Sequence, residues 1–116
     1  MIRTFIDLSL AEGDAERLVR LFGRLPILEA RVSQPGCRSA ALTIAEDGSR
    51  AIATAVWDDH DAYSIWLDHP DRARFGAATA DLLNTAVSGE LTGSRFRIAQ
   101  VATATCQEPG RREEGR

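Results

Sequence analysis

The sequence predicts an α+β fold in which one antiparallel sheet carries its helices on a single face. Apolar and polar side chains alternate near both ends of the chain, which indicates strands. An Asp-Gly pair separates two further β-like runs, which indicates a hairpin. Apolar residues recur at helical spacing in the segments between these strands.

The first strand is predicted over residues 2–10, where five residues of mainly apolar character alternate with Arg, Phe, Asp and Ser. Asp7 is unexpected, because it shares the less apolar side of the strand with Phe5 and Ser9. If that side meets the helices, Asp7 is a cleft carboxylate with a raised pKa. If it does not, Asp7 is an edge position facing solvent, and both interpretations stay open at this point.

A helix is predicted to begin at Gly13-Asp14, where acidic side chains suit the positive end of the helix dipole. Its apolar stripe comprises Leu18, Leu21, Phe22, Leu25, Leu28 and Val32. Pro26 removes a backbone donor and is expected to kink or split this helix near Arg24-Leu25. The stretch Gln34-Pro35-Gly36 ends it.

Residues 37–45 and 50–57 form the predicted hairpin around Asp47-Gly48. With these two residues as the loop, Leu42 faces Ala53, Ala40 faces Ala55 and Arg38 faces Trp57. The small residues beside a large aromatic ring leave room for a flat ligand, or else let helix backbones pack closely on the sheet.

Two further helices and a last strand follow. Asp58 is the expected N-cap of a short helix containing Tyr63 and Trp66. Pro70 opens a longer helix that is expected to end at Ser88-Gly89. Residues 94–105 alternate as the last strand, and the polar tail 107–116 is expected to be disordered, which leaves one domain over residues 1–106.

The resulting order βαββααβ is that of a ferredoxin-like fold. The open face of its sheet is partly apolar, so we expect a homodimer in which the sheets of two subunits stack. The net charge of −3 argues against a nucleic-acid partner, and no apolar run approaches a membrane span. The start of the chain lacks the layout of a signal peptide, so we expect a cytoplasmic protein with reduced Cys37 and Cys106.

All 14 basic residues are Arg, which excludes Schiff-base and phosphate-loop lysines. Arg is therefore the cationic side chain available to donate hydrogen bonds to an anion. No metal is expected, because a helix break separates His60 from His69. Both tryptophans and the single tyrosine, Trp57, Tyr63 and Trp66, fall within ten residues. They offer flat surfaces to a planar aromatic ligand, or they form a core cluster that locks the short helix to the sheet.

The run Val56-Trp57-Asp58-Asp59-His60-Asp61-Ala62-Tyr63-Ser64-Ile65-Trp66-Leu67, preceded by Gln34-Pro35-Gly36-Cys37, resembles the antibiotic biosynthesis monooxygenase family. This family is part of the dimeric α/β-barrel superfamily, and the resemblance covers roughly residues 1–105. It implies a homodimeric enzyme that holds a small aromatic polyketide or polyphenol between sheet and helices. One branch oxidises anthrones or quinols to quinones with O₂ as co-substrate and no cofactor.

The resemblance also implies roles for individual residues. Trp57 and Tyr63 match a Trp and a Tyr of that branch and, with Asp7, are the expected catalytic residues. The expected substrate-binding residues are Trp66, Arg38, Thr43, His69, Arg72 and Arg74. Thr43 stands where that branch has a His, and Ala53 where it has an Asn. A haem-degrading branch has an iron-ligating His ten positions after the short-helix Trp, where this chain has Gly76, so haem is not expected.

Two other functions are compatible with the same residues. A polyketide cyclase of this fold would need acid–base groups, for which Asp7, His69, Arg38 and Tyr63 are candidates. A non-catalytic, dimeric small-molecule-binding module would need none of them.

Overall fold

The computed structural model describes residues 1–83 and 94–104. The elements are β1 (Ile2–Ser9), α1 (Asp14–Arg24), α2 (Ile27–Val32), β2 (Cys37–Ile44), β3 (Arg50–Trp57), α3 (His60–Leu67), α4 (Pro70–Leu82) and β4 (Ser94–Arg97). This order confirms the predicted α+β fold and its four-stranded antiparallel sheet. No helix in the described ranges is long and apolar enough to span a membrane.

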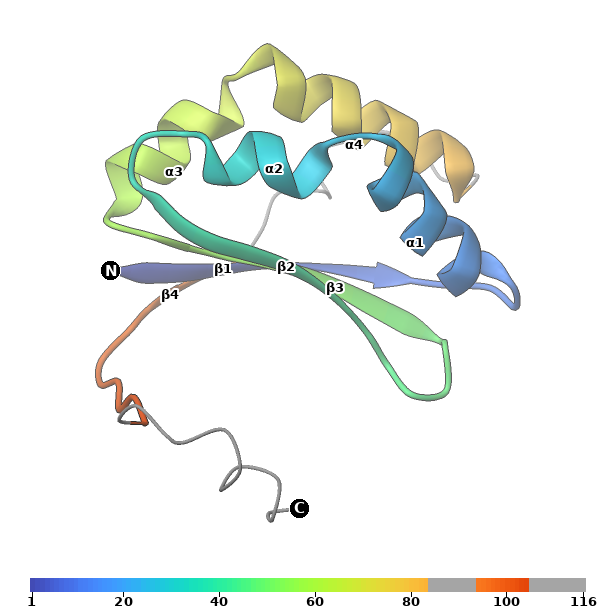
Figure 1. Ribbon diagram of the computed structural model, residues 1–116, viewed down its shortest axis with the longest axis horizontal. Helices are drawn as coiled ribbons and strands as arrows, with labels where there is room; N and C mark the ends of the chain where they lie inside the picture. Colours follow the sequence, from blue (N-terminus) through green and yellow to red (C-terminus); the bar gives the residue numbers. More distant parts are fainter. Residues whose placement is uncertain (84–93, 105–116) are drawn as a thin grey trace.

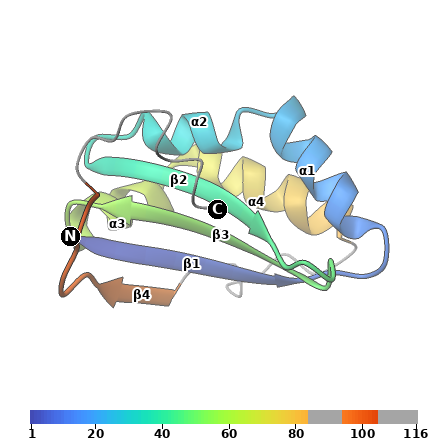
Figure 2. The ribbon, with the colours of Figure 1, turned by 60° about the horizontal axis from the view of Figure 1, so that its bottom comes forward.

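The sheet has the strand order β2-β3-β1-β4, and all the labelled helices lie on one of its faces (Figures 1 and 2). The covered face carries the predicted apolar side of β1, where Ile2, Thr4 and Leu8 are buried. Opposite them on β3, the small residues Ala51, Ala53 and Ala55 are buried in the same layer. None of the helices formed by residues 1–83 and 94–104 lies over the other face of the sheet.

The core consists of two clusters beneath the helices. The first joins α1, α2 and α4 to one end of the sheet through Leu8, Leu18, Leu21, Ile27, Ala51 and Phe75. The second joins α3 to the other end through Ile2, Ala55, Trp57, Tyr63 and Trp66. The helices α1, α2 and α4 therefore share one apolar cluster with the sheet, and α3 packs on the sheet through the other.

The predicted break at Pro26 is confirmed, because α1 ends at Arg24 and α2 begins at Ile27. The break also changes which side of the helix is buried. Leu28 and Val32 were expected to face the core, but Ile27 and Arg31 are buried and Val32 is 43% exposed. Proline cannot continue the hydrogen-bonded turn, so α2 restarts with a new helical phase.

The hairpin register is confirmed near its turn, where Leu42 pairs with Ala53 and Ala40 with Ala55. It is wrong at the far end: Cys37, and not Arg38, pairs with Trp57, because a bulge shifts the register between Cys37 and Ser39. The extra residue of the bulge is Arg38, whose side chain is exposed.

Asp59, and not the expected Asp58, caps α3 by accepting a hydrogen bond from the amide of Ala62 at 2.9 Å. Asp58 is engaged elsewhere, since its own amide donates to the carbonyl of Gly36 at 2.8 Å. Pro70 opens α4 as predicted.

The last strand is shorter than expected. It ends at Arg97, and residues 98–104 form no strand. The predicted helix end at Ser88-Gly89, Cys106 and the tail 107–116 lie outside the described residues.

Candidate functional site

A cavity of about 50 Å³ lies between the sheet and the helices. Its floor is formed by β1 and β3, and its walls come from all four helices seen above the sheet in Figure 1. The lining residues are Ile6, Leu8, Phe22, Ile27, Arg31, Ala53, Trp66, Arg72, Phe75, Gly76 and Thr79. The space above Ala53 is therefore part of the cavity, whereas Ala51 and Ala55 belong to the packed core clusters.

The lining is apolar except for Arg31, Arg72 and Thr79. The Thr79 hydroxyl donates a hydrogen bond to the carbonyl of Phe75 at 2.9 Å, so it is already engaged within α4. No carboxylate or imidazole is among the described residues that line the cavity. The charged groups in this part of the lining are the guanidinium groups of Arg31 and Arg72.

Trp66 lines the cavity together with the aromatic rings of Phe22 and Phe75, and it is 2% exposed. The guanidinium carbon of Arg31 lies 5.8 Å from the centroid of its ring, within the range of a cation–π interaction. The His69 ring stacks on Trp66, with centroids 5.4 Å apart and an interplanar angle of 28°. These two neighbours fix the orientation of the indole that the cavity presents.

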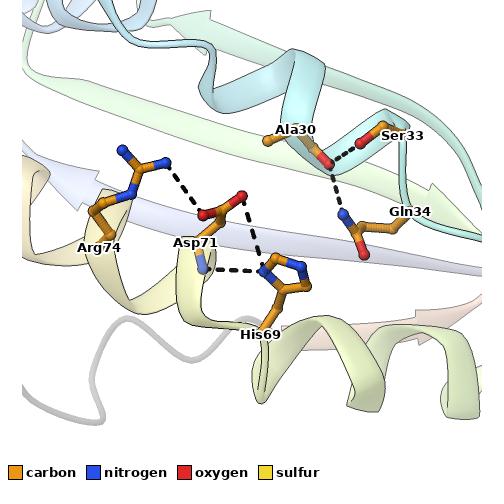
Figure 3. A network of polar contacts seen from close by, with 6 residues as sticks. All are labelled: Ala30, Ser33, Gln34, His69, Asp71 and Arg74. Carbon is orange, nitrogen blue, oxygen red and sulfur yellow. Dashed lines mark hydrogen bonds and ion pairs between the residues drawn. The ribbon is translucent and has the colours of Figure 1, made fainter.

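His69 and Arg74, both predicted to bind substrate, are not among the residues that line the cavity. Figure 3 shows instead that they stabilise the start of α4. His69 Nδ1 accepts a hydrogen bond from the amide of Asp71 at 3.0 Å, and Arg74 pairs with the Asp71 carboxylate at 3.2 Å. Because Arg72 lies in the same helical turn, these contacts position a residue that does line the cavity.

Trp57 and Tyr63, the predicted catalytic pair, are buried beside the cavity but do not line it. Their rings are 5.5 Å apart in a tilted arrangement, and the Trp57 indole donates to the Thr4 hydroxyl at 3.3 Å. The guanidinium of Arg95 lies 4.9 Å from the centroid of the Tyr63 ring. The structure thus places both residues in the cluster that joins α3 to the sheet.

Asp7 lies on the open face of the sheet, so its interpretation as a cleft carboxylate with a raised pKa is wrong. The hydrogen bond from Arg50 holds the pKa of Asp7 below its ordinary value and raises the pKa of Arg50. Thr43 is exposed and hydrogen-bonds the carbonyl of Ile52, the residue that pairs with both Asp7 and Thr43. Neither Asp7 nor Thr43 reaches the cavity.

Arg38 also lies away from the cavity, where it forms an exposed ion pair with Asp58. Its neighbour Cys37 is half-buried, and burial raises the pKa of the thiol. A raised pKa favours the protonated thiol over the reactive thiolate. Among residues 1–83 and 94–104, no group of three or more His, Cys, Asp or Glu side chains is placed to hold a metal ion.

Arg31 is the polar lining residue that the sequence did not reveal. The apolar stripe assigned to its helix assumed one phase from Leu18 to Val32, which placed Arg31 on the solvent side. The signal that could have found it is the pair Ile27 and Arg31, one turn apart in a helix that restarts after Pro26. Its position is fixed by the end of α2, where the Ala30 carbonyl accepts hydrogen bonds from Ser33 and Gln34 (Figure 3).

Comparison with protein-family models gives a match to antibiotic biosynthesis monooxygenase over residues 1–78. Comparison with curated proteins gives no match.

Solved structures share the fold over most of the chain. A Deinococcus radiodurans protein has a TM-score of 0.71 at 19% identity, covering 91% of this chain and all of its own. A Streptomyces coelicolor monooxygenase from the gene ActVA-Orf6, in complex with Nanaomycin D, has a TM-score of 0.71 at 18% identity, covering 90% of this chain and 92% of its own. SnoaB, a cofactor-independent oxygenase from Streptomyces nogalater, has a TM-score of 0.64 at 23% identity, covering 86% of this chain and 94% of its own.

Proposed function

Because the chain belongs to the antibiotic biosynthesis monooxygenase family, we propose that it oxidises an aromatic polyketide or polyphenol to a quinone with O₂ and no cofactor. The observation that carries this proposal is the cavity, whose described lining combines the aromatic ring of Trp66 with the guanidinium groups of Arg31 and Arg72 and contains no carboxylate or imidazole. Similarity to ActVA-Orf6 and to SnoaB, a cofactor-independent oxygenase, supports the same class of reaction.

The reaction balances without an external reductant. The substrate, an anthrone in the simplest case, loses a proton from its methylene carbon to water and becomes an electron-rich anion. The anion is oxidised by O₂, and a carbon–oxygen bond forms at the same carbon. The resulting peroxide anion takes up a proton from water, and the hydroperoxide then loses H₂O together with the second hydrogen of that carbon, so that one oxygen atom remains as the new carbonyl. Stabilising the anion is the main contribution that such a reaction needs from the protein.

The lining residues have matching roles in this proposal. Trp66 stacks on the substrate ring, and Arg72 stabilises the negative charge of the anion. Trp57 and Tyr63 act as positioning residues that hold α3, and with it Trp66, on the sheet. His69 and Arg74 position Arg72 through the start of α4.

The cavity volume of about 50 Å³ is below the roughly 300–1,000 Å³ of ordinary ligand pockets. A substrate with several fused rings therefore has to displace side chains of the wall. The long side chains of Arg31 and Arg72 are those with the most rotamers to move. One- and two-ring polyphenols require less displacement and are the smaller members of the proposed substrate class.

Oxygen uptake with 1,8-dihydroxyanthrone in chelator-treated, flavin-free buffer tests the proposal. We expect uptake and quinone formation by the wild type, and a rate lowered about tenfold or more by Trp66→Leu, which removes the stacking surface. Ile65→Leu is the matched control, since Ile65 is its exposed neighbour on α3 and is expected to retain the rate. Substrate isomerisation without oxygen uptake would favour the cyclase, and binding without turnover would favour the binding module.

The homodimer stays a prediction. Its basis is the open sheet face, where Phe5 and Phe96 stack edge-to-face with centroids 5.4 Å apart and Phe96 is 57% exposed. Sedimentation equilibrium of the purified protein distinguishes a monomer from a dimer directly.

A further inference from the structure

Arg31 has a buried hydrogen-bond donor that no residue in the described part of the chain satisfies. The residue is 8% exposed, and its Nε atom is buried without a hydrogen-bond partner among the described residues. None of the ion pairs formed within residues 1–83 and 94–104 involves Arg31. Within residues 1–83 and 94–104, the ionisable groups that act on its pKa are Tyr63, Cys37 and Arg72, none of which is a carboxylate.

A cation in this position costs folding free energy, because burial without a counter-ion removes its hydration. Burial accordingly lowers the pKa of the Arg31 guanidinium, and the positive charge of Arg72 acts in the same direction. Arginine nonetheless stays protonated in proteins, so the charge is retained. An anion bound to Arg31 would supply both the missing hydrogen-bond acceptor and a counter-charge.

The surroundings of Arg31 show which kind of anion fits. Ile27, one turn earlier on α2, lines the same cavity, as do the aromatic rings of Trp66 and Phe75. The guanidinium itself lies over the Trp66 ring. A ligand placed against this wall therefore meets apolar and aromatic surface over its body and a cation at one end.

We propose that Arg31 binds the ionised oxygen of the aromatic substrate, so that the cavity takes up the phenolate or enolate in preference to the neutral form. The inference rests on the proposed function, because it names the form in which that substrate is bound. The proton released on ionisation passes to solvent water, and the charge left on the oxygen is held by the Arg31 Nε–H group. Arg31 is in this way a binding residue for the species that O₂ oxidises.

A chromogenic phenol tests this inference without any oxidation. 4-Nitrophenol is titrated with base in excess protein, and the absorbance of its yellow anion reports the apparent pKa of the bound probe. We expect the wild type to lower that pKa by about one unit, which corresponds to about tenfold tighter binding of the anion than of the neutral phenol. Arg31→Met, which keeps much of the side-chain volume without the charge, is expected to remove the shift.

Two controls separate binding from structure. Arg20→Met removes an exposed charge from α1 and is expected to shift the probe as the wild type does. 4-Nitroanisole, which cannot ionise, is expected to bind wild type and Arg31→Met equally, as measured by quenching of tryptophan fluorescence. If Arg31→Met does not fold, Arg31→Gln, which keeps a polar side chain without the charge, carries the same comparison.

The inference is overturned if the wild type leaves the probe pKa unchanged, or if both neutralised variants shift it as the wild type does. Because 4-nitrophenol is not consumed, this outcome is independent of oxygenase activity. A lowered pKa of the bound probe, together with no oxygen uptake from 1,8-dihydroxyanthrone, would count against the proposed function. It would still support the anion-binding role of Arg31.

Discussion

The Trp57 indole Nε1 donates a hydrogen bond to the Thr4 hydroxyl, 3.3 Å away, inside the cluster that joins α3 to the sheet. Both residues are buried, and they come from neighbouring strands, β3 and β1. The bond satisfies the one polar atom of the Trp57 side chain. It therefore fixes the ring on which Tyr63 packs and, through α3, the wall of the cavity.

Replacing Thr4 with Val removes this acceptor while nearly keeping the side-chain shape. The buried indole N–H then lacks a partner, so we expect a loss of about 1–3 kcal/mol in the free energy of unfolding, measured by urea denaturation. Thr43→Val is the matched control on the open face, where Thr43 is exposed, and its expected effect is within about 0.5 kcal/mol. Equal losses in the two variants would contradict the role given to the Thr4 hydroxyl.

The ion pair between Asp7 and Arg50 predicts a pH dependence of stability. The hydrogen bond from Arg50 lowers the pKa of Asp7 in the folded protein below the ordinary value of 3.8. Ionised Asp7 therefore stabilises the fold above that ordinary pKa, and the contribution is lost as pH falls through the lowered pKa. We expect the wild type to have a higher urea midpoint than Asp7→Asn at neutral pH, and the two midpoints to converge on acidification. A difference that grows in acid would show the opposite shift.

Gly36 is required for two separable reasons. Its φ of +87° disfavours any other residue, and an added Cβ would lie 2.6 Å from the Cβ of Ala62 on α3. Gly13 has nearly the same φ, +86°, with open space around it. Gly13→Ala is therefore expected to cost about 1–2 kcal/mol of unfolding free energy for the backbone alone.

Gly36→Ala is expected to cost about 1–3 kcal/mol more than Gly13→Ala, because the clash with Ala62 adds to the backbone strain. Urea denaturation of the two variants measures the difference. If Gly36→Ala cost no more than Gly13→Ala, the close approach of Gly36 to Ala62 on α3 would not constrain the fold.

The phase of α2 predicts which of its apolar residues matters. Ile27→Ala is expected to cost about 2–5 kcal/mol, since Ile27 is buried in the first core cluster. Val32→Ala, at a residue 43% exposed, is expected to stay within about 0.5 kcal/mol. Thermal or urea unfolding of both variants checks this. If Val32→Ala cost more than Ile27→Ala, the result would support one continuous apolar stripe from Leu18 to Val32 instead.

Local signals predicted the fold well because each one acts over a few residues. The Asp47-Gly48 turn determines the hairpin register near the turn, and the pairing of Leu42 with Ala53 follows from it. The register predicted from the turn is wrong at Arg38, because tertiary contacts determine the strand pairing there. The chain there is held by the hydrogen bond from Asp58 to Gly36 and by the approach of Gly36 to Ala62, neither of which the hairpin pattern contains.

The candidate site was harder to predict than the fold. Trp66 and Arg72, two of the residues expected to bind substrate, line the cavity between sheet and helices, because α3 and α4 lie over the sheet as the resemblance implied. Arg31 was missed because Pro26 resets the helical phase by an amount that periodicity alone does not give. Asp7 and Thr43 were assigned to the site although strand alternation places both on the side of the sheet away from the helices.

The fate of molecular oxygen distinguishes the proposed monooxygenase from a cyclase and from a binding module. Wild-type protein freed of metals and flavin is given 1,8-dihydroxyanthrone under ¹⁸O₂, and the quinone is analysed by mass spectrometry. We expect one ¹⁸O atom in each quinone formed, with none incorporated from H₂¹⁸O in a parallel reaction under ordinary O₂. Product that forms without oxygen, or whose new oxygen comes from water, would contradict it.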